Sequence, residues 1–185
     1  MGKGRLRMSA GWRAMGPADL DTVMSIADVV HPDYPEERSV FAERLALFPD
    51  GCRMAVSDGV PVGYIVLHPG VIGVPPPLDT PLGSLPEAPD CLYLHDVALL
   101  PEARGLGLAA SAVQQMEALA AERGFRWLAL TSTPKARAYW DRQGFMPHDG
   151  GPALAAKLAS YGGGMTYMTR KVPMGDGSGV GAERP

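Results

Sequence analysis

One stretch of the sequence, residues 92–110, combines a histidine with a glycine turn at the start of a helical pattern. His95 lies in an apolar run, and Arg104 follows in a short link. Gly105 and Gly107 then open the helical pattern, where backbone N–H groups have no partner inside the helix. The helix dipole adds partial positive charge there, which favours an anion such as a phosphate. Histidine, with an ordinary pKa of about 6.5, can accept a proton near neutral pH. The stretch therefore predicts a site for a phosphorylated ligand beside a proton acceptor.

The glycine turn alone is compatible with other sites. Gly105-x-Gly107-x-x-Ala110 fits a dinucleotide-binding fingerprint, which needs glycines directly after a strand and an acidic residue at the end of the next strand. Here residues 101–104 intervene, and the next strand ends at 131–133 without an acidic residue. A P-loop needs a Lys-Ser/Thr pair after the glycines, and none follows. A plain strand–turn–helix with glycines for packing is the remaining alternative.

The elements that must position these residues follow from apolar periodicity and turn residues. We expect strands over 12–15, 52–57, 62–67, 91–100, 127–131 and 165–172, with a further strand starting at Phe145. We expect helices over 17–30, 37–48, 108–122 and 134–143. Hairpins make part of the sheet antiparallel, and the helical crossovers after Leu100 and Thr131 make part of it parallel. The order predicts a mixed α/β (α+β) fold.

Residues 69–90 differ from the rest because they hold seven prolines. Such a segment cannot fill a helix interior or a central strand, so we expect a long loop or flap of functional importance. The glycine-rich residues 173–185 predict a disordered tail. The remainder, 1–172, is expected to be a single domain.

Composition excludes several classes of function. The chain of 185 residues is 46% apolar and 20% charged with a net charge of −3, so no basic field favours nucleic acid or a membrane surface. No apolar run is long enough for a membrane span, and the start is not a signal peptide, so a cytoplasmic location is expected. Cys52 and Cys91 predict two free thiols. The four histidines show no metal-ligand spacing, and we expect no metal.

Two motifs together resemble those of the GNAT N-acetyltransferase superfamily. Arg104-x-x-Gly107-x-Ala109 is similar to its Arg/Gln-x-x-Gly-x-Gly/Ala motif, and residues 136–145 resemble its later Ala-x-x-x-Tyr-x-x-x-Gly-Phe signature. The element order matches from about Trp12 to Val172. The resemblance implies a largely antiparallel sheet of about seven strands, with a splayed central pair and about four flanking helices.

The resemblance also implies acetyl-CoA as cosubstrate, lying between the splayed strands. Its pantetheine arm would pair with the backbone of the central strand, and its pyrophosphate would rest on the N–H groups of the glycine turn. The residues implied to bind the cosubstrate are Val97, Ala98, Leu99, Arg104, Gly105, Leu106, Gly107, Leu108, Ala109, Ala110, Thr133 and Trp140.

The reaction implied is the attack of a neutral amine on a thioester, for which His95 is the candidate general base. In the arylalkylamine N-acetyltransferases a histidine matches His95 and serves a proton relay; a histidine packed and hydrogen-bonded within the sheet is the alternative. Strand alternation would put Tyr93, a possible relay, on the same face as His95, together with Val97 and Leu99, and Asp96 on the opposite face. A backbone N–H near Val97 to Leu99 could stabilise the developing oxyanion.

The sequence departs from the family pattern at two positions. The tyrosine that usually protonates the leaving thiolate matches Trp140, whose indole N–H is not a useful acid, so its role is open. Trp140 is expected to pack over the pantetheine, and the neighbouring Tyr139 to face elsewhere. A CoA-binding asparagine of the family matches Thr133, which can still hydrogen-bond.

In this superfamily the loop between the first two helices and the loop before the central strand line the acceptor pocket. Here those are residues 31–37 and the proline-rich segment, so Tyr34 and His68 are candidate acceptor-binding residues, although His68 beside Pro69 is expected to stabilise a turn. We expect a small primary amine as acceptor. The alternatives are a protein N-acetyltransferase and a non-catalytic acyl-CoA binding or sensing module. Dimers are common among such proteins, so a homodimer is one expected state.

Overall fold

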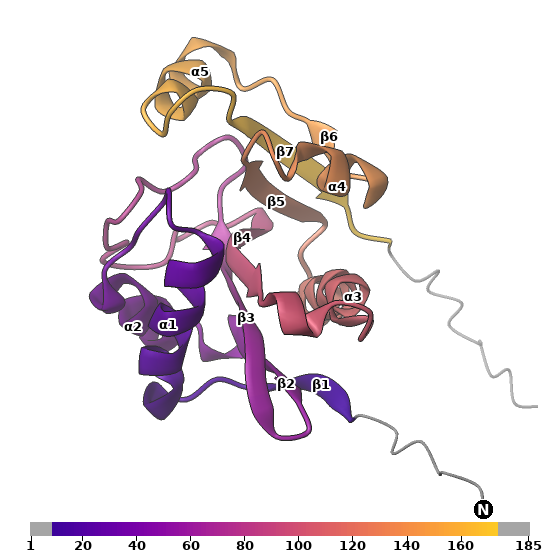
Figure 1. Ribbon diagram of the computed structural model, residues 1–185. Coiled ribbons are helices and arrows are strands. Elements are labelled where there is room, and N and C mark those ends of the chain that lie inside the picture. Colours follow the sequence, from indigo (N-terminus) through magenta and orange to yellow (C-terminus); the bar gives the residue numbers. More distant parts are fainter. Residues whose placement is uncertain (1–8, 174–185) are drawn as a thin grey trace, which may run out of the picture.

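A computed structural model describes residues 9–173, which form one seven-stranded sheet with helices on both faces (Figure 1). The strands are β1 (Ala10–Ala14), β2 (Cys52–Ser57), β3 (Val60–Gly70), β4 (Cys91–Leu99), β5 (Trp127–Ser132), β6 (Met146–Pro147) and β7 (Thr166–Lys171). Their order is β1-β2-β3-β4-β5-β7-β6, and only β4 and β5 run parallel. The prediction of a mixed, largely antiparallel sheet of about seven strands is confirmed.

The helices are α1 (Leu20–Val30), α2 (Arg38–Leu47), α3 (Leu108–Glu122), α4 (Arg137–Arg142) and α5 (Gly151–Ala159), with 3₁₀ turns at Pro17–Asp19, Pro49–Gly51 and Pro101–Ala103. The sequence predicted about four helices, and α5 was missed. Glycines precede and follow its nine residues, which obscured the helical spacing of Leu154 and Leu158. Those two leucines pack against β4, β5 and β7, so α5 closes one end of the sheet.

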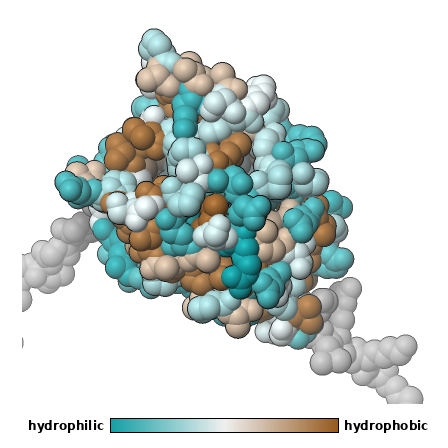
Figure 2. Space-filling model, turned by 90° about the vertical axis from the view of Figure 1, so that its left-hand side faces the viewer, coloured by the Kyte–Doolittle hydropathy of each residue, from teal (hydrophilic) through white to brown (hydrophobic). Residues whose placement is uncertain are grey.

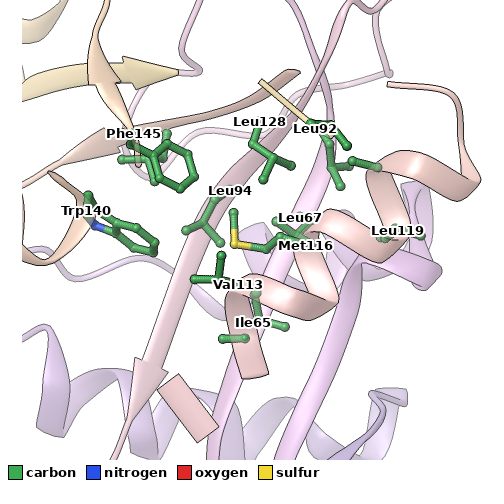
Figure 3. Packing of buried hydrophobic residues seen from close by; sticks show 14 of the residues in the cluster. Ile65, Leu67, Leu92, Leu94, Val113, Met116, Leu119, Leu128, Trp140 and Phe145 are labelled. Carbon is green, nitrogen blue, oxygen red and sulfur yellow. The ribbon is translucent and has the colours of Figure 1, made fainter. Parts of the chain in front are cut away.

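The helices divide between the two faces of the sheet. α1 and α2 pack with Phe41 and Leu45 on Tyr64 and Val66 of β3. The opposite face carries α3, whose Val113 and Met116 point toward Leu94 of β4 and toward β3 (Figure 3). Full burial of one such side chain contributes roughly 1.5–3 kcal/mol, so this core holds β4 firmly between two layers. On the α1–α2 side of the surface, hydrophilic and hydrophobic residues lie in small interspersed patches (Figure 2).

β4 and β5 separate soon after they pair. Their register runs only from Leu92↔Leu128 to Leu94↔Leu130. β4 then continues to Leu99 beside β3, while β5 continues beside β7. The carboxyl ends of two parallel strands are a common place for a ligand site, and here these ends diverge.

A β-bulge interrupts β4 at His95. Asp96 pairs with Val66 and Leu94 pairs with Leu67, so two steps along β4 correspond to one step along β3. The extra residue of a bulge shifts the alternation of side chains between the two faces, and bulges are frequent beside active sites. Each side chain after His95 therefore lies on the face opposite to the one that the alternation before His95 would give it.

β3 extends further than predicted, through His68 and Pro69 to Gly70. β2 covers β3 only as far as Val66, so this end of β3 has β4 as its strand neighbour. A proline is tolerated there because this end of β3 has a hydrogen-bonded neighbour on one side only. The predicted turn at His68 is therefore wrong, and the proline-rich loop begins after Gly70. The tail prediction concerns residues of which all but Pro173 lie outside the described range.

No helix among residues 9–173 is long and apolar enough to cross a membrane.

Candidate functional site

A cleft of about 320 Å³ opens where β4 and β5 separate. Residues from β4, β5, α3 and α4 line one part of it, and residues from the α1–α2 loop, the proline-rich loop and the α5–β7 segment line the other. Its lining includes His31, Tyr34, Glu36, Pro76, Pro77, Leu78, Tyr93, His95, Asp96, Val97, Leu99, Ala109, Thr133, Tyr139, Trp140, Tyr161 and Met165. The cleft therefore joins the glycine turn to both loops predicted to receive the acceptor.

The α3 N-terminus offers a built anion site at one end of the cleft. Gly105 and Gly107 have φ values of +77° and +74°, which side chains rarely adopt. Among the described residues, the backbone N–H groups of Gly105, Gly107 and residues 108–110 have no hydrogen-bond acceptor. The first backbone hydrogen bond of the helix runs from Ser111 N–H to Gly107 O. Arg104 lies exposed beside the turn. These free donors fit the pyrophosphate of a CoA thioester.

The β4 backbone also has free hydrogen-bonding groups at the cleft. Leu100 N–H donates to Val62 O, so by antiparallel alternation Ala98 and Asp96 also face β3. Val97 and Leu99 then direct their N–H and C=O groups away from β3, where β5 has departed; of these groups, Val97 O already accepts a hydrogen bond from His31. Ala98 is buried against α1 and α2 and lies outside the cleft lining. An extended pantetheine arm fits beside Val97 and Leu99 as an added strand.

His95 lies in the cleft wall with its side chain 5% exposed. Its Nε2 atom is 3.0 Å from Glu36 Oε1, close enough for an ion pair, although the two groups are not aligned for a hydrogen bond. Its ring also contacts Phe41 edge-on and lies 6.0 Å from the His68 ring, centroid to centroid. His95 therefore lies between a carboxylate of the α1–α2 loop and two aromatic rings at the cleft wall.

A second histidine reaches the cleft from the end of α1. His31 Nε2 lies 3.0 Å from Asp96 Oδ1 and 3.0 Å from Val97 O. Tyr64 donates its hydroxyl hydrogen to the other oxygen of Asp96. Burial alone would raise the pKa of Asp96, but the His31 and Tyr64 hydrogen bonds and the neighbouring histidines outweigh it and lower that pKa. Asp96 is thus an ionised carboxylate fixed between two donors.

His68 and Tyr93 form the floor behind His95. His68 Nδ1–H donates to Pro69 O at 2.8 Å, and its ring lies against Tyr93. Burial, only partly opposed by this hydrogen bond, lowers the pKa of His68 to about 4, so the ring is neutral near pH 7. Tyr93 shares a hydrogen bond of 2.9 Å with Thr131, and burial raises its pKa. Tyr93 lines the cleft, whereas His68 lies outside the lining.

Two aromatic residues of α4 line the cleft side by side. Trp140 is buried and its ring faces that of Phe145 (Figure 3). The ring centroid of Trp140 lies 5.3 Å from that of Phe145 and 4.8 Å from that of Tyr139. Tyr139 donates its hydroxyl hydrogen to Ala109 O at 3.0 Å, near the glycine turn. The prediction that Tyr139 faces elsewhere is wrong, because the short helix presents both neighbouring rings to the cleft from its end.

The proline-rich loop is fixed over the cleft by hydrogen bonds to α2 and to Tyr161. Glu43 accepts hydrogen bonds from Leu82 N–H at 2.7 Å and Gly83 N–H at 2.9 Å. The fully buried Arg44 donates to Thr80 O at 3.1 Å. From the other side, Tyr161 donates to Pro76 O at 2.5 Å. The loop is therefore anchored at both ends of the segment that covers the cleft.

The structure brings together many of the predicted site residues. Those in the cleft lining are Tyr34, Tyr93, His95, Val97, Leu99, Ala109, Thr133 and Trp140. Those outside the lining are His68, Ala98, Arg104, Gly105, Leu106, Gly107, Leu108 and Ala110, although the turn residues flank it.

The predicted distribution of side chains on β4 is wrong. Tyr93 and His95 share the α1–α2 side of the sheet, but Val97 and Leu99 pack toward the α3 side. Asp96 does not face away from His95; it lies on the same side, against Tyr64. The bulge at His95 is the reason, since it reverses the alternation from that residue onward.

Sequence reasoning missed His31, Tyr64 and Tyr161 as site residues. Glu36 lies in the 31–37 loop expected to line the acceptor pocket, but its contact with His95 was not predicted. His31 and Glu36 approach β4 from the α1–α2 loop, and no spacing within one segment signals such a contact. A carboxylate in the apolar β4 run, Asp96, was the one available signal, because a buried acid requires partners.

A divergent parallel strand pair, with free N–H groups at the next helix, defines the class of acyltransferases that take an acyl-CoA thioester. Residues 20–145 match the sequence profile of the Acetyltransferase (GNAT) family. The chain therefore belongs to the GNAT acetyltransferase family.

Solved structures share this fold at low identity. The loading GNATL domain of CurA from Lyngbya majuscula superposes with a TM-score of 0.73 at 13% identity, covering 89% of this chain and 98% of that one. The ribosomal-protein-S18-alanine N-acetyltransferase from Escherichia coli gives 0.61 at 15% identity, covering 92% and 98%. N-acetylglutamate synthase from Neisseria gonorrhoeae, solved with coenzyme A and N-acetyl-glutamate, gives 0.68 at 16% identity, covering 89% and 35%. A comparison with curated protein sequences finds no match.

Proposed function

We propose that this acetyltransferase moves the acetyl group of acetyl-CoA to a primary amine of a small molecule, by direct attack with His95 as general base. The observation that carries the proposal is the position of His95: it lies in the cleft wall, with Glu36 3.0 Å away, just before the part of β4 that has free backbone groups. The base and the thioester would therefore meet in one enclosed space.

The cosubstrate would be held by three parts of this chain. The free N–H groups of Gly105, Gly107 and residues 108–110 would hold the pyrophosphate, with Arg104 beside them. The Val97 and Leu99 backbone would hold the pantetheine arm, and Trp140 would pack over it. Acetyl-CoA supplies the acyl group and a thiolate that leaves readily.

A base is needed because most of the amine is charged. An alkylamine with a pKa near 10.4 is protonated in all but roughly one molecule in a few thousand at pH 7. A base placed to take that proton typically accelerates such a reaction by about 10²–10⁴-fold. Glu36 supports this role by stabilising the charge that His95 gains.

The anchored proline-rich loop favours a small acceptor. Pro76, Pro77 and Leu78 cover the cleft, and Tyr161 holds this segment through Pro76 O. An extended peptide would need an open groove at this position. Tyr34 and the apolar loop residues would contact the body of a small amine.

The experiment is to mix the protein with acetyl-CoA and a panel of small amines and to measure released CoA. Turnover of a small amine supports the proposal. Acetylation of a lysate protein with no small-molecule turnover would redirect it to a protein acceptor. Binding of acetyl-CoA by calorimetry without turnover would favour a non-catalytic acyl-CoA sensor, which Trp140 at the family's tyrosine position keeps as the second candidate.

A further inference from the structure

Two protons must leave the amine in the proposed reaction. A bound ammonium, R–NH₃⁺, forms a C–N bond as the C–S bond of the thioester breaks. The products are the amide R–NH–COCH₃, the thiol HS–CoA and one H⁺. One proton therefore ends on sulfur, and the other must reach solvent. His95 is 5% exposed and has little access to solvent for that second proton.

His31 has the hydrogen-bonding arrangement of an oriented base. Its Nε2 atom lies 3.0 Å from both Asp96 Oδ1 and Val97 O. An ionised carboxylate and a carbonyl can only accept, so Nε2 carries a hydrogen in both charge states of the ring. The neutral ring then has its lone pair on Nδ1. Asp96 is itself held by Tyr64, so the ring orientation is fixed from behind.

His31 also lies where a proton can enter and leave. It lines the cleft and also a side cavity of about 190 Å³, whose lining includes Asp28, Tyr34, Glu36 and Asp96. Glu36, which faces His95, lines both spaces as well. The His31 side chain is 30% exposed. Of the two histidines in the cleft wall, His31 is therefore the one in contact with solvent.

We propose that His31, oriented by Asp96, accepts at Nδ1 the amine proton that must leave and passes it to solvent through the side cavity. This inference rests on the proposed function, because it concerns a proton released by that reaction. It assigns His31 a proton-transfer role, Asp96 and Tyr64 positioning roles, and the side cavity the role of a proton exit.

The surroundings of His31 favour its charged form. Burial alone would lower the pKa of His31, but the hydrogen bond and charge of Asp96, the Val97 carbonyl and the charge of Glu36 together raise it. The titratable groups around the ring are Asp28 of α1, Tyr34 and Glu36 of the α1–α2 loop, Tyr64 of β3, and His95 and Asp96 of β4. A raised pKa suits a group that must hold a proton before releasing it.

The first test uses His31→Gln and His31→Ala, with His148→Gln as the matched control outside the cleft. We expect His31→Gln to lower kcat by about 10²-fold with unchanged acetyl-CoA binding by calorimetry. We expect added imidazole to restore kcat of His31→Ala in proportion to its concentration, and the wild type to show no such dependence. A folded, cosubstrate-binding His31→Ala that imidazole does not restore would overturn the role.

The second test measures the ring itself by ¹⁵N NMR of labelled histidines. We expect neutral His31 to carry its hydrogen on Nε2 and to titrate above the ordinary value of about 6.5, and Asp96→Asn to lower that titration. A neutral ring with its hydrogen on Nδ1 would contradict the proposal. A wild type that releases no CoA with any amine would instead reject the proposed function, whereas an active wild type with an equally active His31→Gln would reject only this inference.

Discussion

Two histidine–carboxylate pairs border the same cleft, and they differ in what surrounds them. His95 and Glu36 are close but not aligned, and both are largely buried. His31 hydrogen-bonds Val97 O and lies 3.0 Å from Asp96, and Tyr64 holds that carboxylate from the other side. In the proposed reaction, His95 and Glu36 suit direct contact with the amine. His31 and Asp96 suit transfer of a proton to solvent.

Replacement of His95 by glutamine tests its role as base. We expect kcat to fall by about 10²–10⁴-fold while the calorimetric affinity for acetyl-CoA stays unchanged, because His95 precedes the β4 residues that would hold the cosubstrate. His148→Gln should leave both quantities unchanged. Equal kcat and an equal pH profile for His95→Gln and wild type would show that His95 is a packed histidine.

Trp140→Phe tests the packing role of the indole. Trp140 lines the cleft and stacks edge-on against Phe145, and its N–H is not a useful acid. We expect KM for acetyl-CoA to rise more than kcat falls. A loss of kcat at constant KM, measured by steady-state kinetics, would contradict this role and point to proton transfer through the indole position.

Residue types and spacing were enough to find some of the site but not the rest. His95, Trp140 and the glycine turn could be found because their motifs lie within one segment. The His31–Asp96 and Glu36–His95 contacts join the α1–α2 loop to β4, some 60 residues apart by number. Such contacts depend on how α1 ends and where the bulge falls, and local patterns report neither.

At the scale of elements, the turn before α3 and the proline-rich loop are the two ends of the cleft. The turn depends on backbone shape, since added Cβ atoms at Gly105 and Gly107 would meet nothing within 4 Å. The loop depends on side chains of α2, which accept and donate hydrogen bonds to its backbone.

Gly107→Ala tests the turn, with Gly59→Ala as a matched control. Gly107 has φ +74° and Gly59, in the β2–β3 hairpin, has φ +82°, and neither position has a close neighbour. Each alanine should destabilise folding by about 1–2 kcal/mol because of the left-handed conformation, measured by urea unfolding. Only Gly107→Ala should also raise KM for acetyl-CoA. An unchanged KM in both variants would argue against a phosphate site at the turn.

Glu43→Gln tests the anchor of the proline-rich loop. Burial alone would raise the pKa of Glu43, but the Leu82 and Gly83 N–H groups and Arg44 outweigh it and lower that pKa, so the anchor is ionised. We expect faster hydrogen exchange at the Leu82 and Gly83 amides and a higher KM for the amine. Glu37→Gln, a neighbouring exposed acid, is the control. Unchanged exchange would mean that other contacts hold the loop.

At the scale of the whole molecule, stability should fall in acid because of His68. Its pKa is lowered to about 4 by burial, against about 6.5 in the unfolded chain. Between pH 4 and pH 6.5, the unfolded chain therefore binds a proton at His68 that the folded chain does not bind. The contribution of His68 to the free energy of unfolding is fully present above pH 6.5. It falls by roughly 3 kcal/mol toward pH 4.

Urea unfolding at pH 7.5 and pH 4.5 measures this loss. His68→Leu should show a smaller difference between the two pH values than wild type, although it is less stable at both if the Pro69 contact matters. His31 acts in the opposite direction: because its pKa is raised in the folded chain, its protonation adds stability as the pH falls from 7.5. An equal difference in variant and wild type would assign the acid sensitivity to other groups.

The fold was more predictable than the site because it depends on repeated local signals. Apolar spacing marked α3 at its observed ends, Leu108 and Glu122, and alternation marked β4 to within one residue. α5 was not predicted because glycines surround it. The end of β3 was not predicted because a proline such as Pro69 normally excludes a strand. Both exceptions lie where an element has neighbours on only one side.

The bulge at His95 gives β4 two independent phases of side-chain placement. Upstream of it, Tyr93 lies on the α1–α2 side of the sheet; downstream, Asp96 and Ala98 lie on that same side, while Val97 and Leu99 lie on the α3 side. Deleting His95, the extra residue, would leave a regular strand in which both halves keep their faces and their pairing with β3. The bulge therefore lets two consecutive residues, His95 and Asp96, lie on the same side of the sheet, which a regular strand would not allow.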